Sequence, residues 1–203
     1  MLAMTMNISN FSFGFPLDDW ARWPVGNGIE TLADELALRY ADGPDAQGVV
    51  RRSVIALNKN ALGKNGIILD EAIWIPNRST GEGMAVLDTL LWGLPKGADP
   101  SAEAFAARRN LKKDMGRGSK VFDYDVRITD VPAGHSVTEA YTIRLRHEKV
   151  IQGYLLFSVF PEGAADAFCL QISTVHLGLM KELGEQMRII AESVEITLRE
   201  SPQ

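Results

Sequence analysis

The segment Phe122-Asp123-Tyr124-Asp125-Val126-Arg127-Ile128-Thr129 alternates apolar and polar residues without a break. A period of two is typical of a β-strand with one buried and one exposed face. The residues Pro132-Ala133-Gly134 then predict a turn, and apolar runs over 137–146, 150–160 and 167–173 predict three more strands. Because consecutive strands joined by short links pair as neighbours, this half of the chain predicts an antiparallel meander.

A helix is predicted after the strands of the meander. An apolar stripe predicts a helix over 178–193, and a short edge strand over 194–198 comes after it. The stripe consists of Met180, Leu183, Met187, Ile190 and Val194.

Upstream of the meander, apolar residues recur at helical steps over 28–41 and 45–61. Asn27 and Glu30 have the spacing of a capping box for the first helix, and Gly63 suits a left-handed end of the second. A strand over 49–57 is the weaker alternative to the second helix.

Two further strands and one helix complete the predicted order. The Ile-rich run 66–76 and the apolar run 83–94 predict strands, with a hairpin turn or a longer loop between them. Asp99 and Pro100 then open an Ala-rich helix that extends to about residue 115.

The N-terminal region begins with an aromatic alternation. Phe11, Phe13 and Phe15 predict a short strand that Pro16 ends, and residues 18–24 predict a loop that carries two indoles. Residues 1–9 are expected to form a disordered extension. The whole pattern predicts the α+β class, as an antiparallel β-sheet meander flanked by helices in a single domain over 1–203.

Composition limits the function classes. The chain has 203 residues, 46% of them hydrophobic, and its formal charge is −5 from 21 basic and 26 acidic residues. A chain of this length can bury a full core without disulfides or metal. An acidic chain lacks the positive field that attracts phosphate backbones, so no nucleic-acid partner is expected.

The sequence also predicts where the chain resides. The uncharged N-terminal stretch lacks the basic residues of a signal peptide and is interrupted by Asn and Ser. No uncharged run reaches the roughly 18 apolar residues of a membrane helix. We therefore expect a cytoplasmic protein without a membrane partner. The one cysteine, Cys169, lies between Phe168 and Leu170 and is expected to be a small core residue.

The order of elements resembles the Mog1/PsbP-like α/β fold group, in its bacterial, actinobacterial-type form. The residues that carry the resemblance are Phe13, Phe15, Pro16 and Trp20, then 131–134, 170–174 and 190–193. The resemblance covers most of the chain as a pattern, through short motifs. It implies a binding or accessory protein, since members of the group include a small-GTPase partner, a photosystem subunit and lipoproteins.

Catalytic and cofactor motifs do not stand out. Gly63-Lys64 is followed by Asn65, and the Gly pairs at 81/83 and 116/118 lack a third glycine, so no nucleotide loop and no cofactor is predicted. The sequence has neither a nucleophile elbow nor a zinc-protease motif. The three histidines, His135, His147 and His176, are far apart and are expected at exposed positions, so no metal site is predicted.

One pair of carboxylates could carry chemistry. Asp123 and Asp125 share a strand face, about 7 Å apart along it, in a pattern that could bind a cation or move a proton. Arg127 extends the same face and can neutralise them, so a solvated strand face is the favoured interpretation.

Two surfaces are candidates for partner binding. One is the basic helix, with Arg108, Arg109, Lys112 and Lys113, whose cations also suit a helix C-terminus. The other is the indole loop, with Trp20, Arg22 and Trp23, where indoles either anchor an interface or close a sheet end.

Three hypotheses follow from these observations. The first is a non-enzymatic interaction or accessory protein with a protein partner that binds these two surfaces. The second is a small-ligand-binding protein or enzyme with a pocket between sheet and helices, where Asp123, Asp125 or His135 supplies the polar groups. The third and weakest is a homo-oligomeric subunit.

Overall fold

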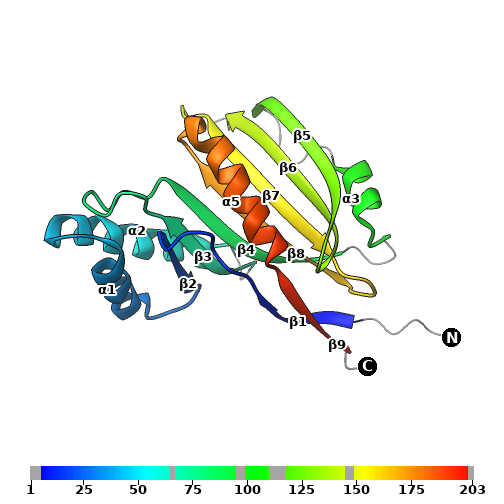
Figure 1. Ribbon diagram of the computed structural model, residues 1–203, viewed down its shortest axis with the longest axis horizontal. Coiled ribbons are helices and arrows are strands. Elements are labelled where there is room, and N and C mark those ends of the chain that lie inside the picture. Colours follow the sequence, from blue (N-terminus) through cyan, green and yellow to red (C-terminus); the bar gives the residue numbers. More distant parts are fainter. Residues whose placement is uncertain (1–5, 65–66, 95–98, 110–117, 145–148, 201–203) are drawn as a thin grey trace.

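A seven-stranded antiparallel sheet organises the protein (Figure 1). The computed structural model describes residues 6–64, 67–94, 99–109, 118–144 and 149–200. The strands lie in the order β2-β3-β4-β8-β7-β6-β5, and helices cover both faces, which confirms the predicted α+β class and the meander. The strands are β2 (Trp20–Pro24), β3 (Ile68–Trp74), β4 (Ala85–Gly93), β5 (Lys120–Val131), β6 (Gly134–Arg144), β7 (Gln152–Phe160) and β8 (Asp166–Thr174).

Two antiparallel helices cover one face of the sheet over β2 and β3 (Figure 1). They are α1 (Ile29–Tyr40) and α2 (Pro44–Leu62), which confirms both predicted helices. Their apolar stripes pack on the side chains of Ala21, Trp23 and Ile73, and we call this side of the sheet the hairpin face. The predicted caps of these helices were wrong, although the predicted bounds hold to within about a residue, because Gly28 at φ 74° precedes α1 without a side-chain cap and Gly63 is right-handed.

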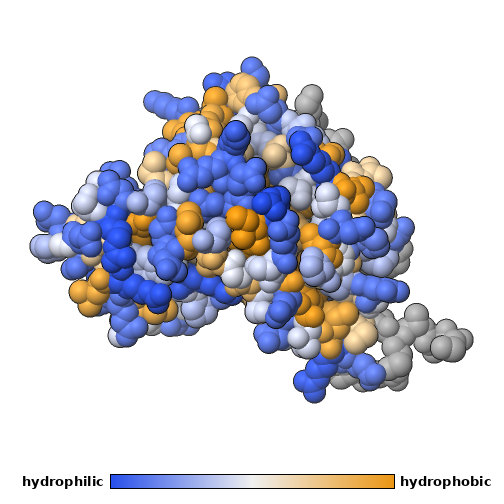
Figure 2. Space-filling model, in the orientation of Figure 1, coloured by the Kyte–Doolittle hydropathy of each residue, from blue (hydrophilic) through white to orange (hydrophobic). Residues whose placement is uncertain are grey.

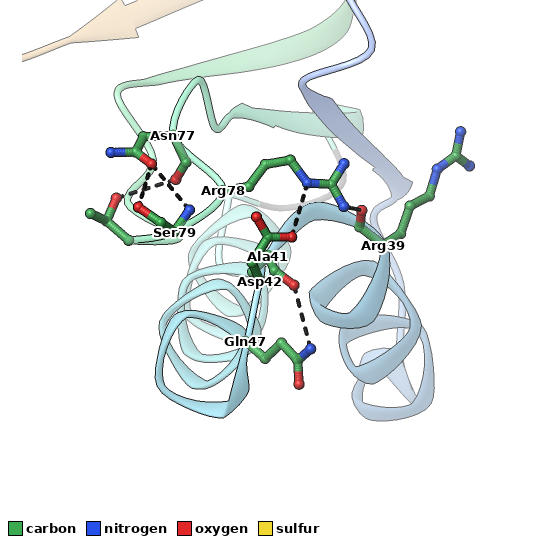
Figure 3. A network of polar contacts seen from close by, with 8 residues as sticks. Arg39, Ala41, Asp42, Gln47, Asn77, Arg78 and Ser79 are labelled. Carbon is green, nitrogen blue, oxygen red and sulfur yellow. Dashed lines mark hydrogen bonds and ion pairs between the residues drawn. The ribbon is translucent and has the colours of Figure 1, made fainter.

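The β3–β4 loop is fastened to the turn between α1 and α2 (Figure 3). Arg78 donates to the backbone carbonyl of Arg39, and its Nε lies 3.5 Å from the Asp42 carboxylate. The Asp42 N–H donates to the carbonyl of Arg78 at 2.8 Å. A Cβ at Gly81 would lie 2.3 Å from the carbonyl oxygen of Ala46, so glycine permits the loop to approach α2 this closely.

The opposite face carries α5 (Met180–Glu192), which runs diagonally over β7 and β8 after the short 3-10 turn η1 (Leu177–Leu179) (Figure 1). The predicted helix over 178–193 is thereby confirmed. Leu183, Met187 and Ile190 are buried against the side chains that β7 and β8 present here, and we call this side the α5 face.

A separate two-stranded ribbon joins the ends of the described chain. Strand β1 (Met6–Ser12) pairs antiparallel with β9 (Glu195–Glu200), so both lie side by side at one end of the molecule (Figure 1). The predicted disordered extension is therefore wrong for residues 6–9, because the backbone of β9 supplies a pairing partner for them. Residues 1–5 lie outside the described residues. The strand expected at Phe11–Phe15 ends at Ser12, and β9 pairs with β1 instead of extending the main sheet.

The helix α3 (Ala102–Arg108) lies against β5 and β6. Ser101, rather than Asp99, caps it, since the Ala104 N–H donates to Ser101 Oγ at 3.1 Å. The predicted continuation toward residue 115 falls largely on residues 110–117, which lie outside the described part of the chain.

Candidate functional site

An open groove lies on the α5 face, between the N-terminal end of α5 and the outer strands β5 and β6. It encloses about 840 Å³. Residues that line it include Asp123, Asp125, Ala140, Thr142, Ile151, Leu177 and Met180. Figure 2 shows this side of the molecule, where hydrophobic and hydrophilic residues lie next to one another over the region between α5 and the outer strands.

The position of α5 creates the groove. The helix packs on β7 and β8 and leaves the α5 face of β5 and β6 uncovered. A Cβ at Gly153 would lie 2.4 Å from Met180 Sδ, so the absence of a side chain there allows the first turn of α5 to sit directly on β7. Gly153 thus allows Met180, which lines the groove, to lie close to β7.

The two walls of the groove differ in chemistry. Leu177, which is 38% exposed, forms an apolar wall together with Ile151 and Met180. Asp123 and Asp125 form an acidic wall on β5. Asp123 accepts a hydrogen bond from Thr142 Oγ1 at 2.9 Å, and Asp125 accepts one from Arg127 Nε at 2.9 Å.

The acidic wall agrees with the interpretation made from the sequence. The two aspartates lie on one face of β5, and Arg127 extends the same row and pairs with Asp125. The carboxylates are exposed at the edge of an open groove, so they suit recognition of a cation or a hydrogen-bond donor. Catalytic proton transfer, in contrast, commonly relies on a carboxyl group that is shielded from water.

The interpretation of the indoles as surface contacts is wrong. Trp20 and Trp23 belong to strand β2, not to a loop, and are 3% and 0% exposed. The Trp20 indole N–H donates to Gln186 Oε1 at 2.7 Å, and its ring stacks against those of Phe15 and Trp74. The alternative that the indoles close a sheet end is the one that their burial supports.

Arg22, between the two indoles, is held by intramolecular contacts. Its guanidinium lies 2.5 Å from the Asp70 carboxylate and 4.2 Å from the centre of the Phe13 ring. With one third of its side chain exposed, it contributes more to packing over Phe13 than to a docking surface.

The predicted basic docking face is divided by the structure. Arg108 is exposed and donates to the backbone carbonyl of Asp99 at 3.1 Å. Arg109 turns toward the sheet, where its Nε lies 3.0 Å from the carboxylate of Glu139, so its role as a docking residue is wrong. Lys112 and Lys113 lie outside the described residues.

The ion pair of Arg109 is buried under α3. The Glu139 side chain is 1% exposed and also accepts a hydrogen bond from the Tyr124 hydroxyl at 2.7 Å. Two donors therefore hold a carboxylate on the hairpin face that burial alone would destabilise. This contact fixes the end of α3 to β6.

The histidines and the cysteine lie apart from the groove. His135 is exposed and its Nδ1 lies 2.6 Å from the Asp130 carboxylate, at the opposite end of β5. His176 is exposed, as expected, and His147 lies outside the described residues. Cys169 is fully buried, which confirms its interpretation as a core residue, and burial raises the pKa of its thiol to about 12.

A buried pair of carboxyl groups was missed by the sequence analysis. Glu71 of β3 lies directly opposite Asp88 of β4 on the hairpin face, and both are nearly inaccessible. Burial, followed by the charge of Asp88, raises the pKa of Glu71 to about 7. Burial also raises the pKa of Asp88, while the nearby Lys64 ammonium lowers it. The available signal was the acidic residues inside the two apolar runs, Asp70 and Glu71 in 66–76 and Asp88 in 83–94.

Neither a metal-binding cluster nor a membrane-spanning helix is found among the described residues. Across the ranges 6–64, 67–94, 99–109, 118–144 and 149–200, the structure has no group of three or more His, Cys, Asp or Glu side chains arranged to hold a metal ion. Among the helices of these same ranges, none has the length and apolar character needed to cross a membrane.

Comparisons with known proteins address the fold. No family model and no curated protein matches the sequence. The structure is similar to the solution structure of the PsbP protein CyanoP from Synechocystis sp. PCC 6803, with a TM-score of 0.51 and 9% identity over 97% of this chain and 94% of that one. It is also similar to LpqN of Mycobacterium tuberculosis, described as involved in cell envelope biogenesis, with a TM-score of 0.50 and 12% identity over 96% of this chain and 85% of that one.

These two likenesses span nearly the whole chain. They confirm the Mog1/PsbP-like fold that the resemblance in sequence implied. At 9% and 12% identity they concern the fold alone, so the role of the chain has to be argued from its own surface.

Proposed function

We propose that this protein is a non-enzymatic accessory protein that binds a protein partner in the groove between α5 and the outer strands. The observation that carries the proposal is the mixed groove itself, where apolar Ile151, Leu177 and Met180 face acidic Asp123 and Asp125. An exposed apolar surface that is rimmed by polar residues is typical of an interaction site, and the solvated aspartates of β5 form such a rim here.

The chemistry of the two groove walls indicates which side chains a partner segment needs. A side chain that fills the space between Leu177 and Met180 must be apolar, and the neighbouring position must carry Lys or Arg to meet the exposed carboxylates. Opposite charges on the rim contribute to orientation and to the association rate more than to affinity. We therefore propose a partner segment that combines an apolar anchor with adjacent basic residues.

Neither structural neighbour is described by an enzymatic activity. One is described as a PsbP protein and the other as a protein involved in cell envelope biogenesis. The cytoplasmic location that the sequence predicted stays a prediction, which fractionation of the host cells and detection of the protein would test.

The first experiment is an affinity pull-down of the tagged full chain from its host lysate, read by mass spectrometry. The groove variant combines Leu177→Glu with Asp123→Lys, which reverses the character of both walls at exposed positions. We expect the recovery of the specific partner to fall by at least about tenfold, which corresponds to 1.4 kcal/mol of binding free energy.

The control for this pull-down is Arg108→Glu, which reverses an exposed cation on α3, away from the groove. We expect the control to recover the partner as the unmodified protein does. Equal recovery of the partner by the groove variant would contradict the proposal. Loss of the partner in the Arg108→Glu control would indicate instead that the basic helix binds it.

A second candidate function is the binding of a small ligand. The groove volume of about 840 Å³ falls within the range of roughly 300–1,000 Å³ that small-molecule sites occupy. The same walls would suit an alkylammonium compound, with its chain against Leu177 and its cation near Asp123. A thermal-shift titration with butylamine, hexylamine and octylamine tests this: stabilisation that rises with chain length and disappears in the groove variant would support it.

A further inference from the structure

Among the described residues, the outer edge of the sheet at β5 is long, and its pairing with β6 is continuous from Asp123 to Val131 after one irregularity between Val121 and Asp123. The strand has twelve residues, pairs on its inner side with β6, and has no strand on its outer side among the described residues (Figure 1). Every side chain from Phe122 to Asp130 is exposed, and no proline interrupts the strand. Native proteins usually shorten, cover or break such an edge, because its unpaired backbone groups are a template for another strand.

The side chains of β5 form two rows of different character. Tyr124, Val126 and Ile128 lie on the hairpin face and are 39–44% exposed. Asp123, Asp125 and Arg127 lie on the α5 face. An edge strand with an apolar row and a row of mixed charge pairs most favourably with a strand whose rows match both.

The central segment of β5, from Tyr124 to Ile128, matches itself when it is reversed. In a two-fold antiparallel pair one residue lies opposite its own copy, and the residues on either side of it lie opposite each other. With Val126 at this centre, Asp125 lies opposite the partner's Arg127 and Arg127 lies opposite the partner's Asp125. On the other face, Tyr124 lies opposite the partner's Ile128.

The neighbouring registers place like charges together. A centre at Asp125 or at Arg127 puts that charge opposite its own copy, and a centre at Tyr124 puts Asp123 opposite the partner's Asp125. Opposite charges across a strand pair stabilise it and like charges destabilise it, so among these registers the charges select the one centred on Val126.

We propose that two copies of this chain associate through β5, in an antiparallel pair with Val126 at the two-fold axis. The partner is a second copy because the segment from Tyr124 to Ile128 complements its own copy in charge and in apolar character when Val126 is at the centre. The pairing joins two seven-stranded sheets into one continuous sheet and places both grooves on the same side of it, since the two-fold axis is perpendicular to the sheet. Pairing through a single edge is a small interface, of the class below about 1,200 Å² that forms transient complexes, so we expect a concentration-dependent equilibrium.

Analytical ultracentrifugation of the full chain over a micromolar concentration series tests the proposal. The unmodified protein should shift from monomer to dimer as concentration rises. Arg127→Asp and Asp125→Arg each create two like-charge pairs across the axis, and each should weaken the dimer by at least about tenfold. Both positions are well exposed, so circular dichroism and thermal unfolding should show an unchanged fold.

Two rescues make the test specific to this register. The double variant Asp125→Arg/Arg127→Asp restores both opposite-charge pairs with their signs exchanged, so it should dimerise again. A mixture of the two single variants should form a heterodimer although neither forms a homodimer, because all four charges then meet opposite charges. The control Arg188→Glu, at an exposed position on α5, should leave the equilibrium unchanged.

Each other outcome overturns the proposal. An unmodified protein that stays monomeric throughout the series contradicts it directly. A dimer that survives Arg127→Asp, or one that neither rescue restores, would show that the copies associate through another surface. Because the groove variant changes Leu177 and Asp123 while these variants change Asp125 and Arg127, failure of one proposal is distinguishable from failure of the other.

Discussion

The two edges of the main sheet differ in every property that controls pairing. Strand β2 has five residues, ends at Pro24, and buries Trp20, Ala21 and Trp23 almost completely. Strand β5 has twelve residues and exposes every side chain from Phe122 to Asp130. One edge is closed by its own side chains, and the other retains both the length and the exposed surface that a partner strand requires.

The difference between the two sheet edges indicates which part of the molecule contributes most to stability and which part is available for association. On the β2 side, helices α1 and α2 and the aromatic cluster at Trp20 bury both faces of the sheet. On the β5 side, α3 reaches the sheet through a buried ion pair and the α5 face stays open as the groove. We therefore expect substitutions on the β2 side to affect mainly unfolding, and substitutions on the β5 side to affect mainly association.

The largest expected effect comes from truncating a buried indole. Trp23→Ala should lower the free energy of unfolding by about 3–5 kcal/mol, because it leaves a cavity between β2 and the α1–α2 pair. The matched change on the other edge, Val126→Ala, should cost within about 0.5–1 kcal/mol, since Val126 is exposed. Urea denaturation measures both, and similar losses would contradict the comparison.

The next effect concerns the attachment of α3. Arg109→Ala should lower the free energy of unfolding by about 3 kcal/mol, because it leaves the Glu139 carboxylate buried with a donor removed. Arg108→Ala, one position earlier and exposed, should change it by no more than about 0.5 kcal/mol. Urea denaturation that found equal losses for the two variants would show that the ion pair contributes nothing specific.

The smallest effect depends on pH and lies on the β2 side. Glu71 has an ordinary pKa of 4.5 and a folded-state pKa of about 7, so the folded protein binds more protons than the unfolded chain between these values. The contribution of Glu71 to stability is thus fully present below about pH 4.5 and is lost as the pH rises through about 7. Glu71→Gln should remove this loss and stabilise the protein at pH 8 by an amount on the order of 2–3 kcal/mol.

Urea denaturation of both proteins between pH 5 and 8 measures this effect. Asp45→Asn, at a solvent-exposed position in the first turn of α2, serves as the control and should not alter the pH dependence. Parallel pH profiles for the unmodified protein and Glu71→Gln would show that the Glu71 carboxyl does not titrate in this way.

The elements with a regular period were predictable, and the short buried strand was not. The alternation along β5 and the helical steps of α1, α2 and α5 are visible because each element has one polar and one apolar side. In β2 the rings of Trp20 and Trp23 are buried on opposite faces of the sheet, so no polar alternation marks the strand. Asp18 and Asp19 before this segment and Pro24 at its end therefore favoured the prediction of a loop.

The candidate site was predictable only in its acidic half. The alternation of β5 placed Asp123 and Asp125 on one face, but Leu177 and Met180 of the apolar wall come from η1 and α5, more than fifty residues later in the chain. In the same way, a sequence cannot distinguish Arg108 from Arg109, because one step at the helix end turns a side chain from solvent to the sheet. Contacts between elements that are far apart in the sequence determine the apolar wall and the direction of each arginine, and a local sequence pattern does not indicate such contacts.

The β1–β9 ribbon also determines how the protein would respond to mechanical load. Met6 pairs with Glu200 at one end of the ribbon, where its backbone is also hydrogen-bonded to Gly163 and Ala165, and Ser12 pairs with Glu195 at the other end. A force applied between Met6 and Glu200 would therefore open the strand pairs one after another, like a zipper, instead of shearing them together. A tether attached at these two points would first load the contacts of Met6 with Glu200 and with Gly163 and Ala165, which lie between β7 and β8.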